Sequence, residues 1–334
     1  MHIRPFGRAD LDAAASLLAA RHRADRSRAP FLPARFETHE AALTALEESL
    51  AEPHTDGAVA LEGGRVVAFL AGGPLFVGPL GRSALYAPPR SVWVTYAAHA
   101  AAPEVARDAY RALYASLAPR WLAAGCFMHI VELPATDRAA MAAWRSLGFG
   151  LEQERGVRDA SPVPGARPPE GVTFRCATPD DIDTVMRLAE GMSRHHAFSP
   201  AFLPYLHEAL LATRDEHRRL LADPRSAYWL ACRGDDVLAM QVFAPLDESM
   251  YTPARCLHLQ DVYTDPAGRG GGLTDALLDR GLAWARHEGH AWVSASWRTA
   301  NLPAYRTWHA HGFMPVRAFL RRIVDERMAW ARAV

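Results

Sequence analysis

The most glycine-rich run of the chain is Asp265-Pro266-Ala267-Gly268-Arg269-Gly270-Gly271-Gly272-Leu273-Thr274. An apolar, strand-like segment precedes it at 257–263, and a segment with apolar residues at helical spacing follows it at 273–286. Glycines let backbone N–H groups approach a ligand closely, and a helix start adds unpaired N–H groups and the positive end of the helix dipole. The order strand, glycine-rich loop, helix therefore predicts a phosphate or pyrophosphate site.

Two common phosphate-binding loops do not fit this run. No lysine follows the glycines, which argues against the P-loop of NTPases. Gly268-Arg269-Gly270 could begin a Rossmann pattern, but Leu273 stands where the third glycine belongs. No acidic residue closes a second strand about 20 residues further on. A plain flexible glycine turn remains the alternative to a pyrophosphate loop.

Motifs on both sides of the loop carry a family resemblance. The run 269–274 resembles the Arg/Gln-x-x-Gly-x-Gly/Ala pyrophosphate loop of GCN5-related N-acetyltransferases (GNATs), with Thr274 at its last position. The run 261–266 looks like the strand end of that family. The run 301–313 resembles its Asn-x-x-Ala-x-x-x-Tyr-x-x-x-Gly-Phe helix, with Trp308 at the Tyr position. The resemblance implies the acetyltransferase fold and acetyl-CoA as the acyl donor.

The sequence also repeats itself once. Phe31-Leu32-Pro33 matches Phe202-Leu203-Pro204 at an offset of 171, and Gly148-Phe149 matches Gly312-Phe313 at an offset of 164. One long repeat indicates two copies of a domain and not a solenoid. A proline-rich segment between the copies reads as a stiff linker. The expected division is a first domain at 1–155, a linker at 156–171 and a second domain at 172–334.

Strand and helix patterns alternate in both halves, which predicts an α/β (α+β) fold. By resemblance, each domain is a mixed twisted sheet with helices on both faces. At the position of the glycine loop, the first half reads Ala97-Ala98-His99-Ala100-Ala101-Ala102-Pro103-Glu104, without glycine or arginine. We therefore expect a degenerate first domain that does not bind the cofactor and that buttresses the second domain or walls its substrate cleft.

Composition narrows the class of partner. The chain has 334 residues and a formal net charge of zero, so no basic field favours nucleic acid. No apolar run is long enough for a signal peptide or a membrane span, and the dispersed cysteines suit a reducing compartment, so we expect a cytoplasmic protein. The histidine spacing in 287–290 does not suit a metal site. A monomer with an internal pseudo-dimer and a homodimer both remain possible.

The resemblance implies which residues hold acetyl-CoA. The backbone N–H of Val262 is a candidate donor to the oxyanion, and Asn301 holds the cofactor arm, caps its helix, or does both. The implied cofactor-binding set is Val262, Tyr263, Thr264, Arg269, Gly270, Gly271, Gly272, Leu273, Thr274, Asn301, Tyr305 and Trp308.

The motifs do not identify a single residue as the catalytic acid. Many GNATs protonate the leaving thiolate with a Tyr, but the indole of Trp308 is a poor acid. Tyr305, one helical turn earlier, is the replacement candidate, and packing or cofactor contact is its alternative role. Ser294 and Ser296 are weaker candidates for this acid.

For the base, strand alternation places Asp261 on the face opposite Gln260 and Val262. Asp261 either takes a proton from the amine, binds the ammonium group, or makes a structural hydrogen bond. His195 and His196, in the loop expected after the first helix of the second half, are further candidates for a base or a substrate contact.

Together these features predict an N-acetyltransferase that moves an acetyl group from acetyl-CoA to a primary amine of a small molecule by direct attack. The active site is expected in the second domain. A non-catalytic acyl-CoA-binding or regulatory protein is the alternative from another class. The tandem layout also resembles mycothiol synthase, which gives a further candidate substrate class.

Overall fold

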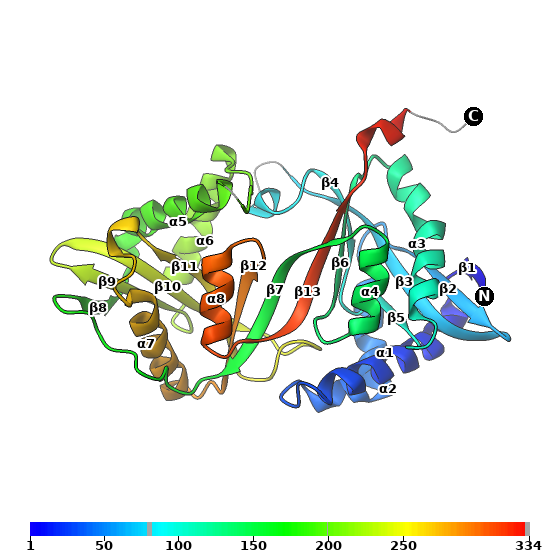
Figure 1. The fold of residues 1–334 in the computed structure, drawn as a ribbon, viewed down its shortest axis with the longest axis horizontal. Coiled ribbons are helices and arrows are strands. Elements are labelled where there is room, and N and C mark those ends of the chain that lie inside the picture. The colour runs from blue at the N-terminus through cyan, green and yellow to red at the C-terminus, as the bar shows by residue number, and fades with distance from the viewer. Residues whose placement is uncertain (79–81, 199, 331–334) are drawn as a thin grey trace. The chain divides into compact units, whose positions relative to one another are not determined.

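The computed structural model describes residues 1–78, 82–198 and 200–330, and the chain forms two compact units (Figure 1). The last residues of the expected second domain, 331–334, lie outside the described part. Each unit combines part of one mixed sheet with helices, so the predicted mixed α/β class is confirmed. The first unit comprises Met1–Gly78, Ala87–Glu154 and Pro315–Val334, and the second comprises Pro79–Tyr86 and Arg155–Met314.

The sheet of the first unit has the strand order β1-β2-β3-β4-β6-β13, and the short β5 pairs with β3. Its core packs α3 and α4 against the sheet around buried aromatic and aliphatic side chains. The elements are β1 (His2–Pro5), α1 (Leu11–Arg26), α2 (His39–Leu50), β2 (Asp56–Glu62), β3 (Arg65–Phe76), β4 (Arg90–Val94), β5 (His99–Ala101), α3 (Ala106–Ala123), β6 (Met128–Pro134), α4 (Arg138–Ser146) and β13 (Met314–Ile323).

The sheet of the second unit has the order β7-β12-β11-β10-β9-β8. Helices α7 and α8 share one hydrophobic core with it, and α5 shares a separate one, so helices cover both faces (Figure 1). The elements are β7 (Gly150–Asp159), β8 (Thr173–Cys176), α5 (Ile182–Ala197), α6 (Leu210–Ala222), β9 (Ala227–Arg233), β10 (Asp236–Leu246), β11 (Cys256–Thr264), α7 (Leu273–His287), β12 (Trp292–Arg298) and α8 (Leu302–Ala310).

The last strand of the second sequence half belongs almost entirely to the first unit. Strand β13 comes from the second half, but it pairs antiparallel with β6 of the first unit, from Arg317 opposite Pro134 to Ile323 opposite Met128. Strand β7 lies beside β12, and the division between the units falls within it, since Glu154 belongs to the first unit and Arg155 to the second. The expected domain at 172–334 therefore needs a correction, because residues from Pro315 onward belong to the first unit.

The proline-rich segment also differs from a simple linker at 156–171. Its first residues continue β7 as far as Asp159. Ala160 and Val163 are buried in the core of the second unit, and the Val163 N–H donates to Asp279 Oδ1 on α7 at 2.8 Å. The segment is thus fixed to the second unit by side-chain burial and hydrogen bonding, which composition alone does not reveal.

Local signals in the sequence mark some of the helix ends. The predicted N-cap Thr38 accepts the Ala41 N–H at 3.3 Å. Gly289 has a φ of +80° just after α7, as expected of a residue that ends a helix. Helix α5 is longer than predicted and extends to Ala197, so His195 and His196 lie on its last turn and not in a loop.

The pairing of β13 with β6 makes a prediction about Leu320 of β13, which is fully buried in the core of the first unit. Leu320→Ala should destabilise the chain by about 2–5 kcal/mol, as expected for a buried leucine. Hydrogen–deuterium exchange should show the loss of protection in β6 and α3. Leu302→Ala, at an exposed position, is the control. A loss confined to β11 and α7 would contradict the assignment of β13 to the first unit.

Candidate functional site

The glycine-rich loop leaves the start of α7 open. Gly270 and Gly272 have φ values of +75° and +74°, which glycine adopts without strain. A Cβ added at either of them would meet no atom within 4 Å. Gly272 is the N-cap of α7 and has no side chain that could accept the first-turn N–H groups. The loop therefore presents unpaired N–H groups to open space, as an anion site requires.

Residues around the loop hold it in place. Gly268 is buried, and a Cβ there would come within 2.8 Å of the Leu273 side chain. Leu273 is itself buried, so it anchors α7 and contributes to the predicted site only through its backbone. Thr264 Oγ1 lies 3.2 Å from Thr274 Oγ1, and Arg269 Nε donates to the Thr264 carbonyl at 3.2 Å. These contacts join the end of β11 to the start of α7.

The parallel pairing of β11 and β12 ends before either strand does. The last paired residues are Leu259 and Ala295, although β11 continues to Thr264 and β12 to Arg298. The backbone of residues 260–264 therefore lies beyond the ladder with β12. This stretch, which pairs with β10 but not with β12, contains the predicted cofactor-binding residues Val262, Tyr263 and Thr264.

A β-bulge in β11 lies at the same point. Val242 of β10 faces Asp261, and Phe243 faces Leu259, so Gln260 has no opposite residue. The Gln260 amide donates to Glu216 Oε1 on α6 at 2.7 Å, and Asp261 also faces α6. The prediction that Gln260 lies opposite Asp261 is therefore wrong, because the bulge interrupts the alternation. Val262 does lie on the other face, where it packs against the α7 and α8 core.

Asp261 is nearly inaccessible, with an exposed fraction of 3%. Its Oδ2 lies 3.9 Å from Nε2 of His217, and Nδ1 of His217 is hydrogen-bonded to the Tyr228 hydroxyl. Both partners are buried as well. None of the sequence motifs includes His217 or Tyr228, so sequence reasoning missed both.

His196 lies close to the same carboxylate. Burial lowers its pKa to about 4, the charges of His195 and Arg298 act in the same direction, and Asp261 opposes them. The imidazole is therefore neutral at pH 7. Its Nε2 lies 3.4 Å from the Asn301 side-chain nitrogen, which fits an imidazole nitrogen that accepts from the amide. The structure thus brings His196 and Asn301 together and lets the charge of Asp261 act on His196, whereas His195 is exposed.

Tyr305 and Trp308 both lie on α8, but their surroundings differ. Asn301 is its N-cap and accepts the Ala304 N–H at 3.4 Å. Trp308 is buried, with its ring centre 5.3 Å from that of Phe313. Tyr305 is 37% exposed, and its ring lies on that of His309 at 4.1 Å between centres. Trp308 therefore belongs to the core, while the Tyr305 side chain is partly exposed.

The serines of β12 are already engaged in hydrogen bonds. Ser294 is buried, and its Oγ lies 2.9 Å from His258 Nδ1. Ser296 Oγ accepts from Nε of Arg155 on β7 at 3.1 Å. Both serines support the polar side chains on this face of the sheet.

The first unit differs at the corresponding places. Only residues 102–105 connect β5 to α3, and they contain no glycine. Glu132, which matches Ser296 at the offset of 164, is buried. Its carboxylate accepts the Tyr96 N–H at 3.1 Å and the Trp93 indole N–H at 2.6 Å. In the first unit, the Glu132 carboxylate therefore occupies the end of β4, and the residues between β4 and α3 contain no glycine.

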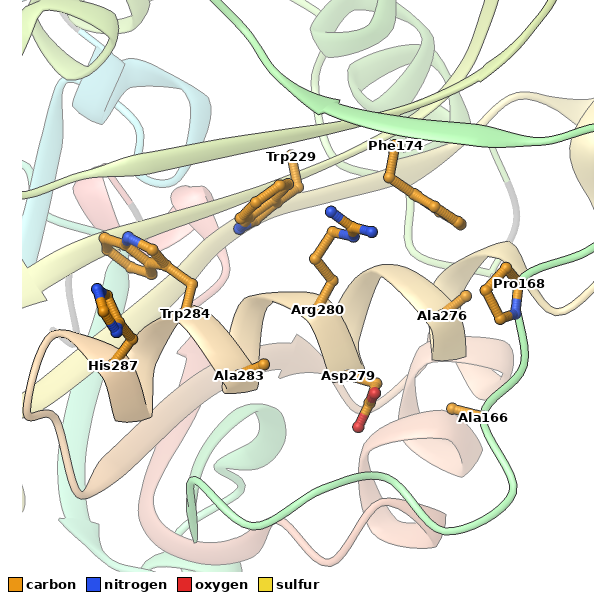
Figure 2. Close-up of a pocket in the computed structure, with 10 residues that line it drawn as sticks. All are labelled: Ala166, Pro168, Phe174, Trp229, Ala276, Asp279, Arg280, Ala283, Trp284 and His287. Carbon is orange, nitrogen blue, oxygen red and sulfur yellow. The ribbon is translucent and has the colours of Figure 1, made fainter.

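A pocket of about 460 Å³ lies between α7, strands β8 and β9 and the segment 166–168, and none of the predicted site residues lines it (Figure 2). Its aromatic walls include Phe174, Trp229 and Trp284. The guanidinium of Arg280 lies 5.4 Å from the ring centre of Phe174 and 5.3 Å from that of Trp229. These cation–π contacts place the arginine across the pocket and cover its aromatic wall.

Among residues 1–78, 82–198 and 200–330, no group of three or more His, Cys, Asp or Glu side chains is placed to hold a metal ion. Within the same residues, no helix has the length and apolar character needed to cross a bilayer.

Comparisons with known proteins agree with this geometry. Residues 193–313 match the model of the acetyltransferase (GNAT) family. A GCN5-related N-acetyltransferase from Sphaerobacter thermophilus shares 18% identity over 96% of this chain and 95% of its own, with a TM-score of 0.59. A tandem GNAT protein from the clavulanic acid biosynthesis pathway shares 16% identity over 97% and 98%, with a TM-score of 0.50. No curated protein matches the sequence. Residues 193–313 thus match the GNAT family model, and the chain as a whole has the fold of these solved structures.

Proposed function

We propose that the chain transfers an acetyl group from acetyl-CoA to a primary amine of a small molecule, with its active site in the second unit. One observation carries the proposal. The open glycine loop at the start of α7 directly follows the stretch of β11 that has left its ladder with β12, and a buried carboxylate lies in that stretch. An anion site, a free strand edge and a proton acceptor thus adjoin one another.

The residues present fit acetyl-CoA. Gly270, Gly271 and Gly272 let the first-turn N–H groups of α7 reach a pyrophosphate, and Arg269 adds a cation at the same loop. The free backbone of 262–264 would hold the pantetheine arm. When bound, acetyl-CoA supplies the acetyl group as an activated thioester.

The protein groups then assist attack by the amine. Asp261 takes a proton from the ammonium group, directly or through water, so that a neutral amine attacks. The Val262 N–H stabilises the negative charge on the carbonyl oxygen, and donors of this kind contribute about 3 kcal/mol. Tyr305 donates a proton to the departing thiolate, since Tyr305 is partly exposed and the indole of Trp308 is buried. The nitrogen loses its second proton to solvent as the amide forms, and Tyr305 regains a proton from solvent.

Binding of the cofactor is tested at Gly271. This glycine has no positive φ, and an added Cβ would lie 3.7 Å from the Gly268 carbonyl oxygen, so the fold tolerates a side chain. At 100 times Kd, acetyl-CoA should stabilise the wild type by about 2.7 kcal/mol, which differential scanning fluorimetry detects as a raised Tm. Gly271→Glu should abolish the shift, because its carboxylate repels the pyrophosphate. Gly271→Ala is the matched control and should keep it. A wild type without any shift would refute the cofactor assignment.

Turnover is tested by thiol release with amines of several classes, including polyamines, aminoglycosides, amino acids and peptide N-termini. We expect activity with at least one class. Asp261→Asn should lower kcat by about 100-fold or more while leaving the acetyl-CoA-induced Tm shift intact, because the carboxylate serves proton transfer. Binding without turnover on any amine would instead indicate an acyl-CoA-binding protein.

The acid is tested by Tyr305→Phe, which removes only the hydroxyl. If Tyr305 protonates the thiolate, kcat should fall by about 100-fold, the lower end of the range for general acids. Tyr305→Trp serves as a second variant that keeps an aromatic ring on His309. A Tyr305→Phe enzyme with wild-type kcat would assign Tyr305 to packing or cofactor contact.

A further inference from the structure

Three buried polar side chains from three elements line up in the second unit. Tyr228 lies on β9, His217 on α6 and Asp261 on β11, and their exposed fractions are 3%, 1% and 3%. The Tyr228 hydroxyl is hydrogen-bonded to Nδ1 of His217, whose Nε2 lies 3.9 Å from Asp261 Oδ2. Burying a hydroxyl, an imidazole and a carboxylate costs free energy that an apolar core would not.

The first unit shows that the fold does not require the imidazole. Helix α2 matches α6 at the offset of 171, and Leu46 stands at the position of His217. Leu46 is fully buried, as His217 is. The same helix position can therefore be filled by an ordinary core residue, and packing alone does not explain the histidine.

The tyrosine is equally specific to the second unit. Strand β2 matches β9 at the same offset, with Gly57 at the position of Tyr228. The match holds in three dimensions, since the Phe6 N–H donates to the Gly57 carbonyl at 2.9 Å and the Ala177 N–H to the Tyr228 carbonyl at 2.8 Å. In the first unit, the Phe6 side chain takes the space, and a Cβ on Gly57 would lie 2.8 Å from it.

The carboxylate completes the set. In the second unit, Val242 of β10 faces Asp261. At the offset of 171, Val242 corresponds to Ala71, whose N–H donates to the Ala98 carbonyl at 2.7 Å. Ala98 therefore occupies the position of Asp261. Tyr, His and Asp occur together in the unit with the open glycine loop, and Gly, Leu and Ala stand in their places in the other unit.

We propose that Tyr228 and His217 form a positioning relay for Asp261, an inference that rests on the proposed acetyltransferase function. A carboxylate only accepts, so the proton of a neutral imidazole lies on Nε2 and faces Asp261. Nδ1 then accepts from the Tyr228 O–H, which fixes the tautomer. At 3.9 Å the contact to Asp261 is electrostatic, and it shortens to a hydrogen bond as the substrate ammonium group binds.

Tyr228 and His217 neither gain nor lose a proton during the reaction. The ammonium group gives its proton to the Asp261 carboxylate, directly or through water, and Asp261 later releases it to solvent. His217 keeps its Nε2 proton throughout and holds the carboxylate in one orientation. Tyr228 and His217 are therefore positioning residues, and Asp261 alone touches the transferred proton.

The relay is tested in the full chain by Tyr228→Phe, which keeps the ring and removes the hydroxyl. The matched control is Tyr114→Phe, which removes a buried Tyr–His hydrogen bond of 2.7 Å from the first unit. We expect Tyr228→Phe to lower kcat about tenfold, a fraction of the effect of losing the base itself, with KM for acetyl-CoA unchanged. Tyr114→Phe should leave kcat unchanged.

A second variant pair examines the histidine. His217→Leu, the residue that the first unit uses, should lower kcat as Tyr228→Phe does, and His217→Gln, which keeps a side-chain N–H donor, should recover part of the loss. Long-range ¹⁵N–¹H NMR of the histidine rings should show His217 protonated at Nε2 only, and this readout does not depend on turnover.

Each failure has its own signature. Wild-type kcat in both Tyr228→Phe and His217→Leu would overturn the relay while leaving the acetyltransferase proposal in place. A His217 ring protonated at Nδ1 would also overturn it. A wild type that binds no acetyl-CoA and acetylates no amine would overturn the proposed function and, with it, the relay.

Discussion

The site depends on one irregularity of β11, the bulge at Gln260. Because Gln260 has no partner on β10, it and Asp261 both face α6, and the strand then continues with its alternation reversed. The ladder with β12 ends at the same point, after Leu259. A single extra residue therefore turns the Asp261 carboxylate toward the face covered by α6. The backbone that follows no longer pairs with β12. Without the bulge, Asp261 would face the apolar core under α7, where a carboxylate has no polar partner.

The two units provide an internal comparison of the same scaffold. Both contain the helix capped by an Asp or Asn that precedes a buried Trp, as Asp137 with Trp144 and Asn301 with Trp308. These features belong to packing, since they persist where the glycine loop is missing. What differs is the glycine loop and the buried polar cluster around Asp261. The differences coincide in one unit, which is why we assign the chemistry to the second unit and a structural role to the shared features.

Much of the fold was predictable because it is encoded locally. Thr38 and Asn301 are N-caps, Gly289 follows a helix end, and the glycine loop lies between a strand and a helix, all as their residue types indicate. Strand β7 was missed because Glu152, Glu154 and Arg155 obscure its apolar pattern. The pairing of β13 with the first unit was missed because the period of a repeat does not say which strands a terminal strand will pair with. The bulge and His217 depend on tertiary pairing, although aligning His217 with Leu46 would have marked the histidine as unusual.

The central claim is that one unit of this tandem chain holds acetyl-CoA and performs the chemistry. The most direct measurement is hydrogen–deuterium exchange of the full chain with and without saturating acetyl-CoA, together with the binding stoichiometry from calorimetry. The account predicts one molecule bound per chain and new protection confined to residues 259–277 and the start of α8. Two molecules bound per chain, or protection at residues 94–106 of the first unit, would contradict it.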